Sequence, residues 1–314
     1  MQSKLNNLKV TIAERTRVQL MELLKKPHEV TKLDLHLREL EEIPEEIFAF
    51  ENLTELNLKN NHLKTLPEKF KIFQHLEKLE LGGNNFTTLP TVLFSLTNLK
   101  HLDLSWNNIG EIPEEIGSLI NLETLSLNHN NITKIADSIG NLKNLKILAL
   151  NNNQLETIPD TIGELHNLEE LYLFENQLST IPVSIGNCRN LKKLELQQNF
   201  LTELPESIGN LGSLEKLRIY KNLLKTLPTS IGKLTHLSKL FLYENQLTEL
   251  PETIGNLHNL VELDLTGNEL LALPETLFNL KQLQKLSITN NQLPKDYIFV
   301  LKEKFPQTKI ECDL

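Results

Sequence analysis

The sequence predicts an α/β solenoid of stacked repeats, each of which contributes a short β-strand. Two observations predict this fold class. Asparagine recurs every 23 residues from Asn61 to Asn291 without an insertion or deletion. Ahead of each asparagine stands an L-x-x-L-x-L pattern, whose period of two is that of a short strand. Because each repeat buries its leucines only against its neighbours, we expect a single continuous domain.

The full unit reads L-x-x-L-x-L-x-x-N-x-L-x-x-L-P-x-x-I-G-x-L-x-N, and LKHLDLSWNNIGEIPEEIGSLIN from Leu99 is one complete example. One period before Asn61 lies Arg38, which gives twelve repeats over residues 30–293. The repeated asparagine can bond backbone groups of adjacent turns. A proline six residues after the asparagine, such as Pro113 after Asn107, stiffens the segment that follows the strand. The glycine four residues after this proline indicates a tight turn or a close backbone approach.

This pattern resembles the leucine-rich-repeat family, in its short 23-residue, spirochaete-like bacterial class. The resemblance covers roughly residues 30 to 293 and implies a curved solenoid with the parallel sheet inside the curve. It implies a bacterial protein with a role at the bacterial surface or against host proteins. The shared residues build the scaffold, so they do not identify a partner.

Both ends of a solenoid need a cover. Residues 1–29 carry apolar side chains at helical spacing until Pro27, which predicts a helical N-terminal cap. These apolar residues are Leu5, Leu8, Ile12, Leu20, Leu23 and Leu24. The alternative, a membrane-surface or partner-binding helix, needs a basic face that acidic residues interrupt. Residues 294–314 predict a C-terminal cap, with a helix at 296–304, a closing strand at 309–312, and Tyr297, Phe299 and Leu301 over the last repeat.

Composition excludes several functions. A net charge of −9 argues against nucleic acid as the main partner, and no apolar stretch is long enough for a transmembrane segment. The N-terminus is not a secretory signal peptide as written. We therefore expect a cytoplasmic protein by default, and an exported or secreted one if a signal was removed. The two cysteines, Cys188 and Cys312, are expected to be structural and unpaired.

The sequence offers no catalytic constellation. It contains no recognisable nucleophile–base pair, so an enzyme with a cryptic site is disfavoured. His101 and Asp103 can share the concave face, but no cluster completes a metal-ligand set. We expect a protein that is not an enzyme and that has neither a metal nor a cofactor.

Aromatic residues gather on the concave face of repeats 7 to 10. Residues before, between and after the last two leucines of each repeat point away from the core. In these four repeats they include Tyr172, Phe174, Tyr220, Phe241 and Tyr243, accompanied by Lys193, Lys216, Arg218 and Lys239. Other phenylalanines, namely Phe50, Phe70, Phe73 and Phe86, replace consensus apolar residues and are expected in the core. Aromatics with arginine are typical of interaction hot spots.

We therefore predict a non-enzymatic scaffold that binds a protein, with an acidic epitope, on the concave face of repeats 7 to 10. The structural alternative is that the aromatics only stack between neighbouring strands. Two functional alternatives use the same face, namely glycan binding by the tyrosines and self-association, although a monomer is expected. Trp106 is expected to be exposed at the concave rim, either as a secondary contact or packed on a neighbouring loop.

Overall fold

The computed structural model describes residues 14–313. The chain divides into two compact units, Met1–Leu148 and Ala149–Leu314, and each is described by itself. Leu5, Leu8 and Ile12 of the predicted N-terminal cap lie outside the described residues. The expectation of one continuous domain stays a prediction.

The first unit stacks parallel strands one repeat apart. Lys32 pairs with Glu55, Glu55 with Lys78, and Lys78 with His101, so every step is 23 residues. The strands are β1 (Lys32–Asp34), β2 (Glu55–Asn57), β3 (Lys78–Glu80), β4 (His101–Asp103) and β6 (Thr124–Ser126), with a separate pair β5 (Glu111–Ile112) and β7 (Lys134–Ile135). β8 (Ile147–Ala149) lies at the division between the units.

The second unit repeats the same arrangement. Its strands are β9 (Glu170–Tyr172), β10 (Lys193–Glu195), β11 (Lys216–Arg218), β12 (Lys239–Phe241), β13 (Glu262–Asp264), β14 (Lys285–Ser287) and β15 (Lys309–Glu311). All neighbours pair in parallel, from Leu171 with Leu194 to Leu286 with Ile310. Within each unit the predicted α/β solenoid with a parallel sheet is confirmed.

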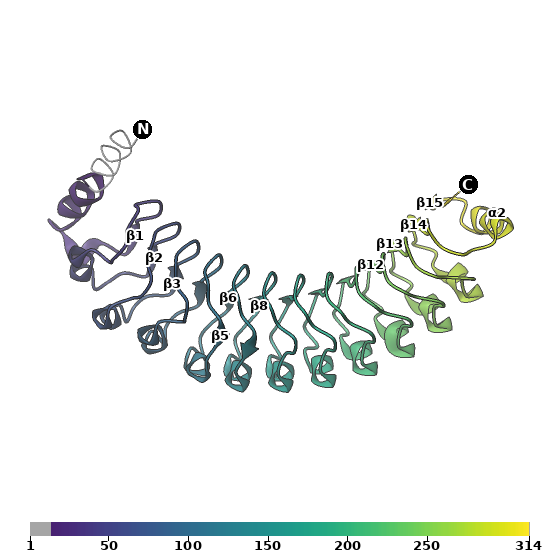
Figure 1. Ribbon diagram of the computed structural model, residues 1–314, viewed down its shortest axis with the longest axis horizontal. Helices are drawn as coiled ribbons and strands as arrows, with labels where there is room; N and C mark the ends of the chain where they lie inside the picture. The colour runs from purple at the N-terminus through teal and green to yellow at the C-terminus, as the bar shows by residue number, and fades with distance from the viewer. Residues whose placement is uncertain (1–13, 314) are drawn as a thin grey trace. The chain divides into compact units, whose positions relative to one another are not determined.

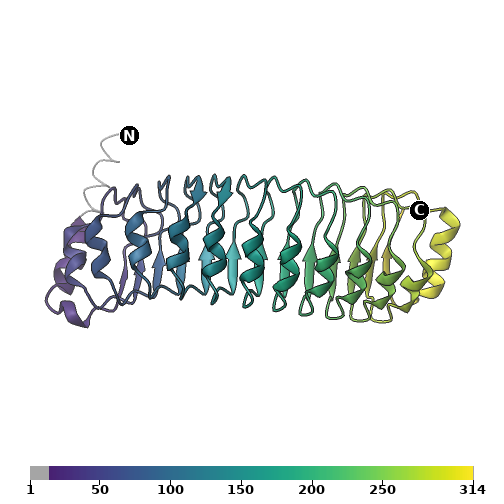
Figure 2. The ribbon, with the colours of Figure 1, turned by 90° about the horizontal axis from the view of Figure 1, so that it is seen from below.

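Short 3-10 helices line the side of each repeat opposite the strands (Figures 1 and 2). They are η2 (Glu45–Ala49), η3 (Glu68–Ile72), η4 (Thr91–Ser95), η5 (Glu114–Ser118), η6 (Asp137–Asn141), η7 (Asp160–Glu164), η8 (Val183–Asn187), η9 (Glu206–Asn210), η10 (Thr229–Lys233), η11 (Glu252–Asn256) and η12 (Glu275–Asn279). A further short helix, η1 (Pro27–Glu29), precedes the first repeat. Each helix from η7 to η12 follows a proline whose extended backbone directs the chain into the turn.

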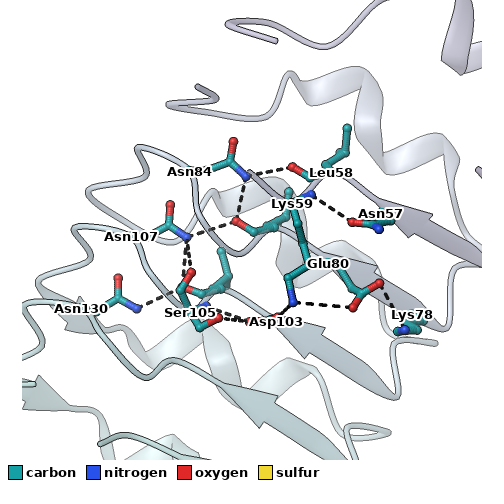
Figure 3. Close-up of polar contacts among 12 residues, drawn as sticks. Asn57, Leu58, Lys59, Lys78, Glu80, Asn84, Asp103, Ser105, Asn107 and Asn130 are labelled. Atoms are coloured by element: carbon teal, nitrogen blue, oxygen red, sulfur yellow. Dashed lines mark hydrogen bonds and ion pairs between the residues drawn. The ribbon is translucent and has the colours of Figure 1, made fainter. Parts of the chain in front are cut away.

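The core lies between strands and helices and is made of the repeat leucines and isoleucines, most of them with no exposed surface. Phe50, Phe70, Phe73 and Phe86 are fully buried in it, as predicted. At its edge stands the asparagine ladder (Figure 3). Asn84 Nδ2 donates to Leu58 O at 3.0 Å and to Leu81 O at 2.9 Å, while its Oδ1 accepts from Leu63 N at 3.0 Å. The asparagine therefore links two adjacent turns, as the repeat predicts.

The repeated glycines are needed for a close approach between neighbouring helices. A Cβ at Gly186 would overlap with the carbonyl oxygen and Cβ of Ser207 in the next repeat. From η7 to η11 the helix backbone thus packs directly on the next helix, which accounts for glycine at this point of the unit.

The two caps are only partly as predicted. A helix covers residues 14–23, in which Leu20 is buried, while Leu23 and the following Leu24 are half-buried. At the other end α2 (Lys295–Lys304) and β15 match the predicted helix and strand within one residue. Leu301 is buried, but Phe299 is 73% exposed, so its expected place over the last repeat is wrong. Among residues 14–313, no helix is long and apolar enough to cross a membrane.

Candidate functional site

The predicted residues of repeats 7 to 10 share one face of the sheet in the second unit. Strands β9 to β12 hold them in register, with Glu195 beside both Tyr172 and Arg218, and Arg218 beside Phe241. We call this surface, with Phe174, Lys193, Lys216, Tyr220, Lys239 and Tyr243, the aromatic face. Trp106, the remaining predicted residue, belongs to the first unit.

The aromatic rings are half-buried by one another and by neighbouring side chains. Tyr220 and Tyr243 stack with their centroids 4.0 Å apart and their planes at 12°. Burial, followed by a hydrogen bond with the Tyr220 side chain, raises the pKa of Tyr243 well above its usual range. The cross-strand stacking that we considered as the structural alternative therefore exists for this pair.

A buried carboxylate organises the cations at the centre of the aromatic face. Glu195 is only 5% exposed, and its Oε1 accepts a hydrogen bond from Arg218 Nη1 at 2.7 Å. Lys216 Nζ lies 3.7 Å from the same oxygen. The Arg218 guanidinium also lies over the ring of Phe241, 5.5 Å from its centroid. An ion pair and a cation–π contact thus hold Arg218 in place.

One carboxylate faces two cations here, which leaves the centre electropositive. Burial, and then the positive charge of Arg218, lower the pKa of Lys216 below its usual value. The charges of Lys193 and Lys239 act in the same direction. An additional carboxylate placed near Lys216 would relieve this repulsion.

The edge of the aromatic face on repeats 7 and 8 is closed by a triad. Lys193 Nζ donates to Tyr172 Oη at 3.0 Å and to Glu170 Oε2 at 3.3 Å, and Tyr172 Oη donates to Glu170. The hydrogen bond between Lys193 and Tyr172 raises the pKa of Lys193, so the lysine stays charged. On the other side Lys239 lies 3.8 Å from Glu262. These basic residues are therefore already paired in part.

The sequence analysis missed two exposed apolar residues on repeats 8 and 9, which also carry part of the aromatic face. Phe200 and Leu223 follow the ladder asparagines of repeats 8 and 9 and are 54% and 38% exposed. The same position holds histidine, asparagine, glutamine or glutamate in the other repeats from the second to the twelfth, as in Gln177 and Gln246. Two apolar residues at a position that is otherwise polar were the sequence signal that could have identified them. We call Phe200 and Leu223 the apolar rim.

Trp106 lies three residues beyond the end of β4 and is 61% exposed, as predicted. Its ring stacks on His129 of the next repeat, with centroids 3.7 Å apart and planes at 14°. Both residues have positive φ, at 56° and 55°, because the chain turns sharply there. Packing on a neighbouring loop is thus realised, while much of the indole remains accessible.

The described residues contain no group of three or more metal-ligating side chains. Cys188 is buried, and burial raises the pKa of its thiol to about 11, so it is unsuited to act as a nucleophile. Cys312 is half-buried and free.

Comparison with known protein families gives a consistent result. Residues 91–183 and 230–303, together more than half of the chain, match a family described as a leucine-rich repeat region. Residues 189–247 and 52–72 match two further leucine-rich repeat families. No curated protein matches this chain.

Several solved structures are similar. A leucine-rich-repeat protein of Leptospira interrogans is 28% identical, with a TM-score of 0.65 over 93% of this chain and 98% of that one. An internalin of Listeria monocytogenes, at 22% identity, shares the fold with a TM-score of 0.83 over 96% and 89%. FLRT2, solved in an octameric complex with Latrophilin 3 and Unc5D, is 25% identical, with a TM-score of 0.72 over 91% and 90%. The two bacterial neighbours are consistent with the bacterial class that the sequence resembles.

Proposed function

The chain belongs to the leucine-rich-repeat family, whose members are protein-interaction scaffolds and generally not enzymes, and we propose that it binds a protein partner through the aromatic face. The binding residues would be Tyr172, Phe174, Lys193, Lys216, Arg218, Tyr220, Lys239, Phe241 and Tyr243. Trp106 would be a secondary contact.

The observation that carries this proposal is the arrangement around Arg218. Glu195 and Phe241 hold the guanidinium in one position among half-buried aromatic rings. Hot spots of protein interfaces are enriched in arginine and tyrosine. Side chains that are already ordered in the free protein lose less conformational entropy when a partner binds. Repeats 7 to 10 span three strand spacings, about 15 Å, which suits the centre of an interface.

The charge at this centre favours a partner with an acidic epitope. Because Glu195 is shared by Arg218 and Lys216, a carboxylate of the partner next to Lys216 would complete a second ion pair. We expect this contact to favour fast, salt-dependent association more than affinity.

The apolar rim supports a protein partner as well. Phe200 and Leu223 add exposed apolar surface on two of the repeats that carry the aromatic face, and such surface in soluble proteins often marks an interaction site. The alternative of glycan binding by the tyrosines is disfavoured here. Tyr220 and Tyr243 cover each other's faces, and Lys193 lies 5.3 Å from the ring centroid of Tyr172.

The test is capture of partners from lysate, followed by mass spectrometry, with substitutions taken from other repeats. Tyr220→Thr with Tyr243→Thr uses the residues found in register at Thr266 and Thr289, so the fold should be kept. A matched control, Val183→Thr, changes an apolar residue that is 70% exposed on η8. We expect a protein that wild type and the control capture and that the double variant loses.

Sizing chromatography tests the remaining alternative, which is self-association through the aromatic face. A dimer of wild type that becomes a monomer in the tyrosine double variant would indicate self-association through this face. Equal capture by all three proteins, with unchanged circular dichroism, would overturn the proposal and leave the stacked tyrosines a structural role.

A further inference from the structure

The sheet of the second unit ends in a strand whose outer edge is free. β15 is the last strand in the sheet order, and among the described residues no strand pairs with its far side. Lys309 N donates to Gln284 O at 2.8 Å, and Glu311 O accepts from Ile288 N at 2.8 Å, so both residues bond towards β14. Backbone groups of successive residues in a strand point to opposite sides. The N–H and C=O of Ile310 therefore point to the free edge.

Apolar side chains are exposed around this edge. Ile310 is half-buried, whereas Leu263 and Leu286, its equivalents in the two preceding strands, have no exposed surface. α2 is the last helix at this end of the second unit (Figures 1 and 2). Its Phe299 and Val300 are 73% and 39% exposed. Pairing with a further strand would therefore cover apolar surface as well as backbone groups.

The outer side of α2 adjoins the segment that follows β15. Ile298 and Phe299 line a hollow of about 120 Å³ together with Lys295, Lys302 and Asp313. The four α2 residues are spaced by three or four, so they share one face of the helix. This face and the free edge of β15 form one surface, which we call the C-terminal end face. It comprises Ile298, Phe299, Val300, Lys309, Ile310 and Glu311.

The charges of β15 are complementary to those of a second β15 strand. If two copies of this strand pair antiparallel about Ile310, Lys309 of each copy stands opposite Glu311 of the other. Opposite charges directly across a strand pair stabilise it. The two Ile310 residues would form a hydrogen-bonded pair, in which each N–H at the free edge donates to the C=O of the other copy.

The contacts that Lys309 and Glu311 already make are compatible with this pairing. Ser287 Oγ donates to Glu311 Oε2 at 2.8 Å and Lys309 Nζ donates to Oε1 at 2.6 Å, so the carboxylate is held in place. The Lys309 side chain is 72% exposed, and an exposed ion pair of this kind contributes little. Lys309 can therefore turn to the glutamate of a neighbouring strand, as Lys285 does at 3.5 Å from Glu311.

The other strand that could extend the sheet is β1 of another copy. Strands of this sheet pair in parallel, and β1 added in the same register would place Lys32 beside Lys309 and Asp34 beside Glu311. Like charges directly opposite each other are destabilising. The charge pattern therefore favours a two-fold dimer over a head-to-tail chain of copies.

We propose that the C-terminal end face binds a second copy of this chain, with the two β15 strands paired antiparallel around Ile310. A two-fold axis through this pair would bring α2 of one copy towards α2 of the other and so cover Phe299 and Val300. Such a dimer differs from the monomer that we expect from the sequence. It would leave both aromatic faces free, because β13 and β14 separate them from β15, so it does not depend on the proposed function.

Sedimentation velocity of the full chain over micromolar concentrations tests the dimer. Wild type, the Tyr220→Thr with Tyr243→Thr variant and Lys225→Glu should all form it, the last being a matched charge reversal at an exposed lysine of repeat 9. Lys309→Glu should raise the Kd of the dimer by about tenfold or more, because both symmetry-related contacts become repulsive. Circular dichroism should show the same fold for all four proteins.

Disulfide trapping tests the register. Ile310→Cys, made together with Cys312→Ser, should give a disulfide-linked dimer on mild oxidation, because the two Cα atoms would lie about 5.5 Å apart. Thr308→Cys in the same background is the control, since the two copies of residue 308 would lie about 13 Å apart and should not link.

Several outcomes would overturn the proposal. They are a wild-type monomer at every concentration, oligomers that keep growing with concentration, or a dimer that is lost in the tyrosine double variant. A dimer that Lys309→Glu leaves unchanged, or that Ile310→Cys does not link, would overturn it as well.

Discussion

The asparagine ladder allows a quantitative prediction for Asn199→Leu. Asn199 is 5% exposed and makes three short hydrogen bonds. Its Oδ1 accepts from Leu178 N at 2.9 Å, and its Nδ2 donates to Leu173 O and Leu196 O, both at 3.0 Å. Leucine has a similar size but can make none of these bonds.

The neighbouring asparagines limit the damage. Leu173 O keeps a hydrogen bond from Asn176, and Leu196 O keeps one from Asn222. The amide of Leu178, in contrast, loses the acceptor on Asn199. A buried donor without a partner costs about 1–3 kcal/mol, and each of the other two bonds contributes about 0.5–1.5 kcal/mol. After a small gain from the apolar side chain, we expect the free energy of unfolding to fall by about 3 kcal/mol.

Urea unfolding followed by circular dichroism measures this loss, and hydrogen exchange locates it. The Leu178 amide should exchange faster, while the Leu247 amide, bonded to Asn268, should be unchanged. Asn190→Leu is the matched control, because Asn190 makes an exposed bond to His166 O and should change stability by less than about 0.5 kcal/mol. A loss below about 1 kcal/mol for Asn199→Leu, with Leu178 still protected, would refute the reasoning.

Three further predictions concern the helices, the C-terminal cap and the buried thiol. Gly186→Ala should lower the free energy of unfolding by about 1–3 kcal/mol because its Cβ meets the next helix, whereas Gly212→Ala, with open space around it, should be nearly neutral in the same urea experiment. Hydrogen bonding from Lys309 lowers the pKa of Glu311 from 4.5 to about 2, so its contribution to the cap is present above pH 4.5 and is lost as the pH falls towards about 2; protection of the cap amides at intermediate and low pH measures this loss. The thiol of Cys188 should resist iodoacetamide in the native protein and react once urea unfolds it, and mass spectrometry reads out both states.

The error at the C-terminal cap has a simple cause. Tyr297, Phe299 and Leu301 are spaced by two, which is the period of a strand, yet they lie on the helix α2. On a helix, residues four apart share a face, so Tyr297 and Leu301 face the repeats and Phe299 does not. Tyr297 Oη donates to Leu273 O of repeat 11 at 3.0 Å, while Phe299 faces solvent.

For the candidate site, the sequence predicted which residues share a face but not how they pair. Alternation along each strand put Tyr220, Arg218 and Tyr243 on one side. Whether the two tyrosines stack, or Arg218 binds Glu195, depends on rotamers chosen against side chains one repeat away, which no local pattern encodes. The apolar rim was visible in the sequence as a break in a polar row and was overlooked.

The sequence by itself determined the repeat, the strand register and the core of this protein. Because the period is strict, only one arrangement of neighbouring repeats buries every leucine and completes the hydrogen bonds of every ladder asparagine. The tertiary structure alone decided how charges are shared on the aromatic face and what surrounds Trp106. Those outcomes depend on distances between side chains 21 to 44 residues apart, such as Lys193 with Tyr172 and Lys59 with Asp103. Only the stacked repeats bring such side chains within a few ångströms of each other.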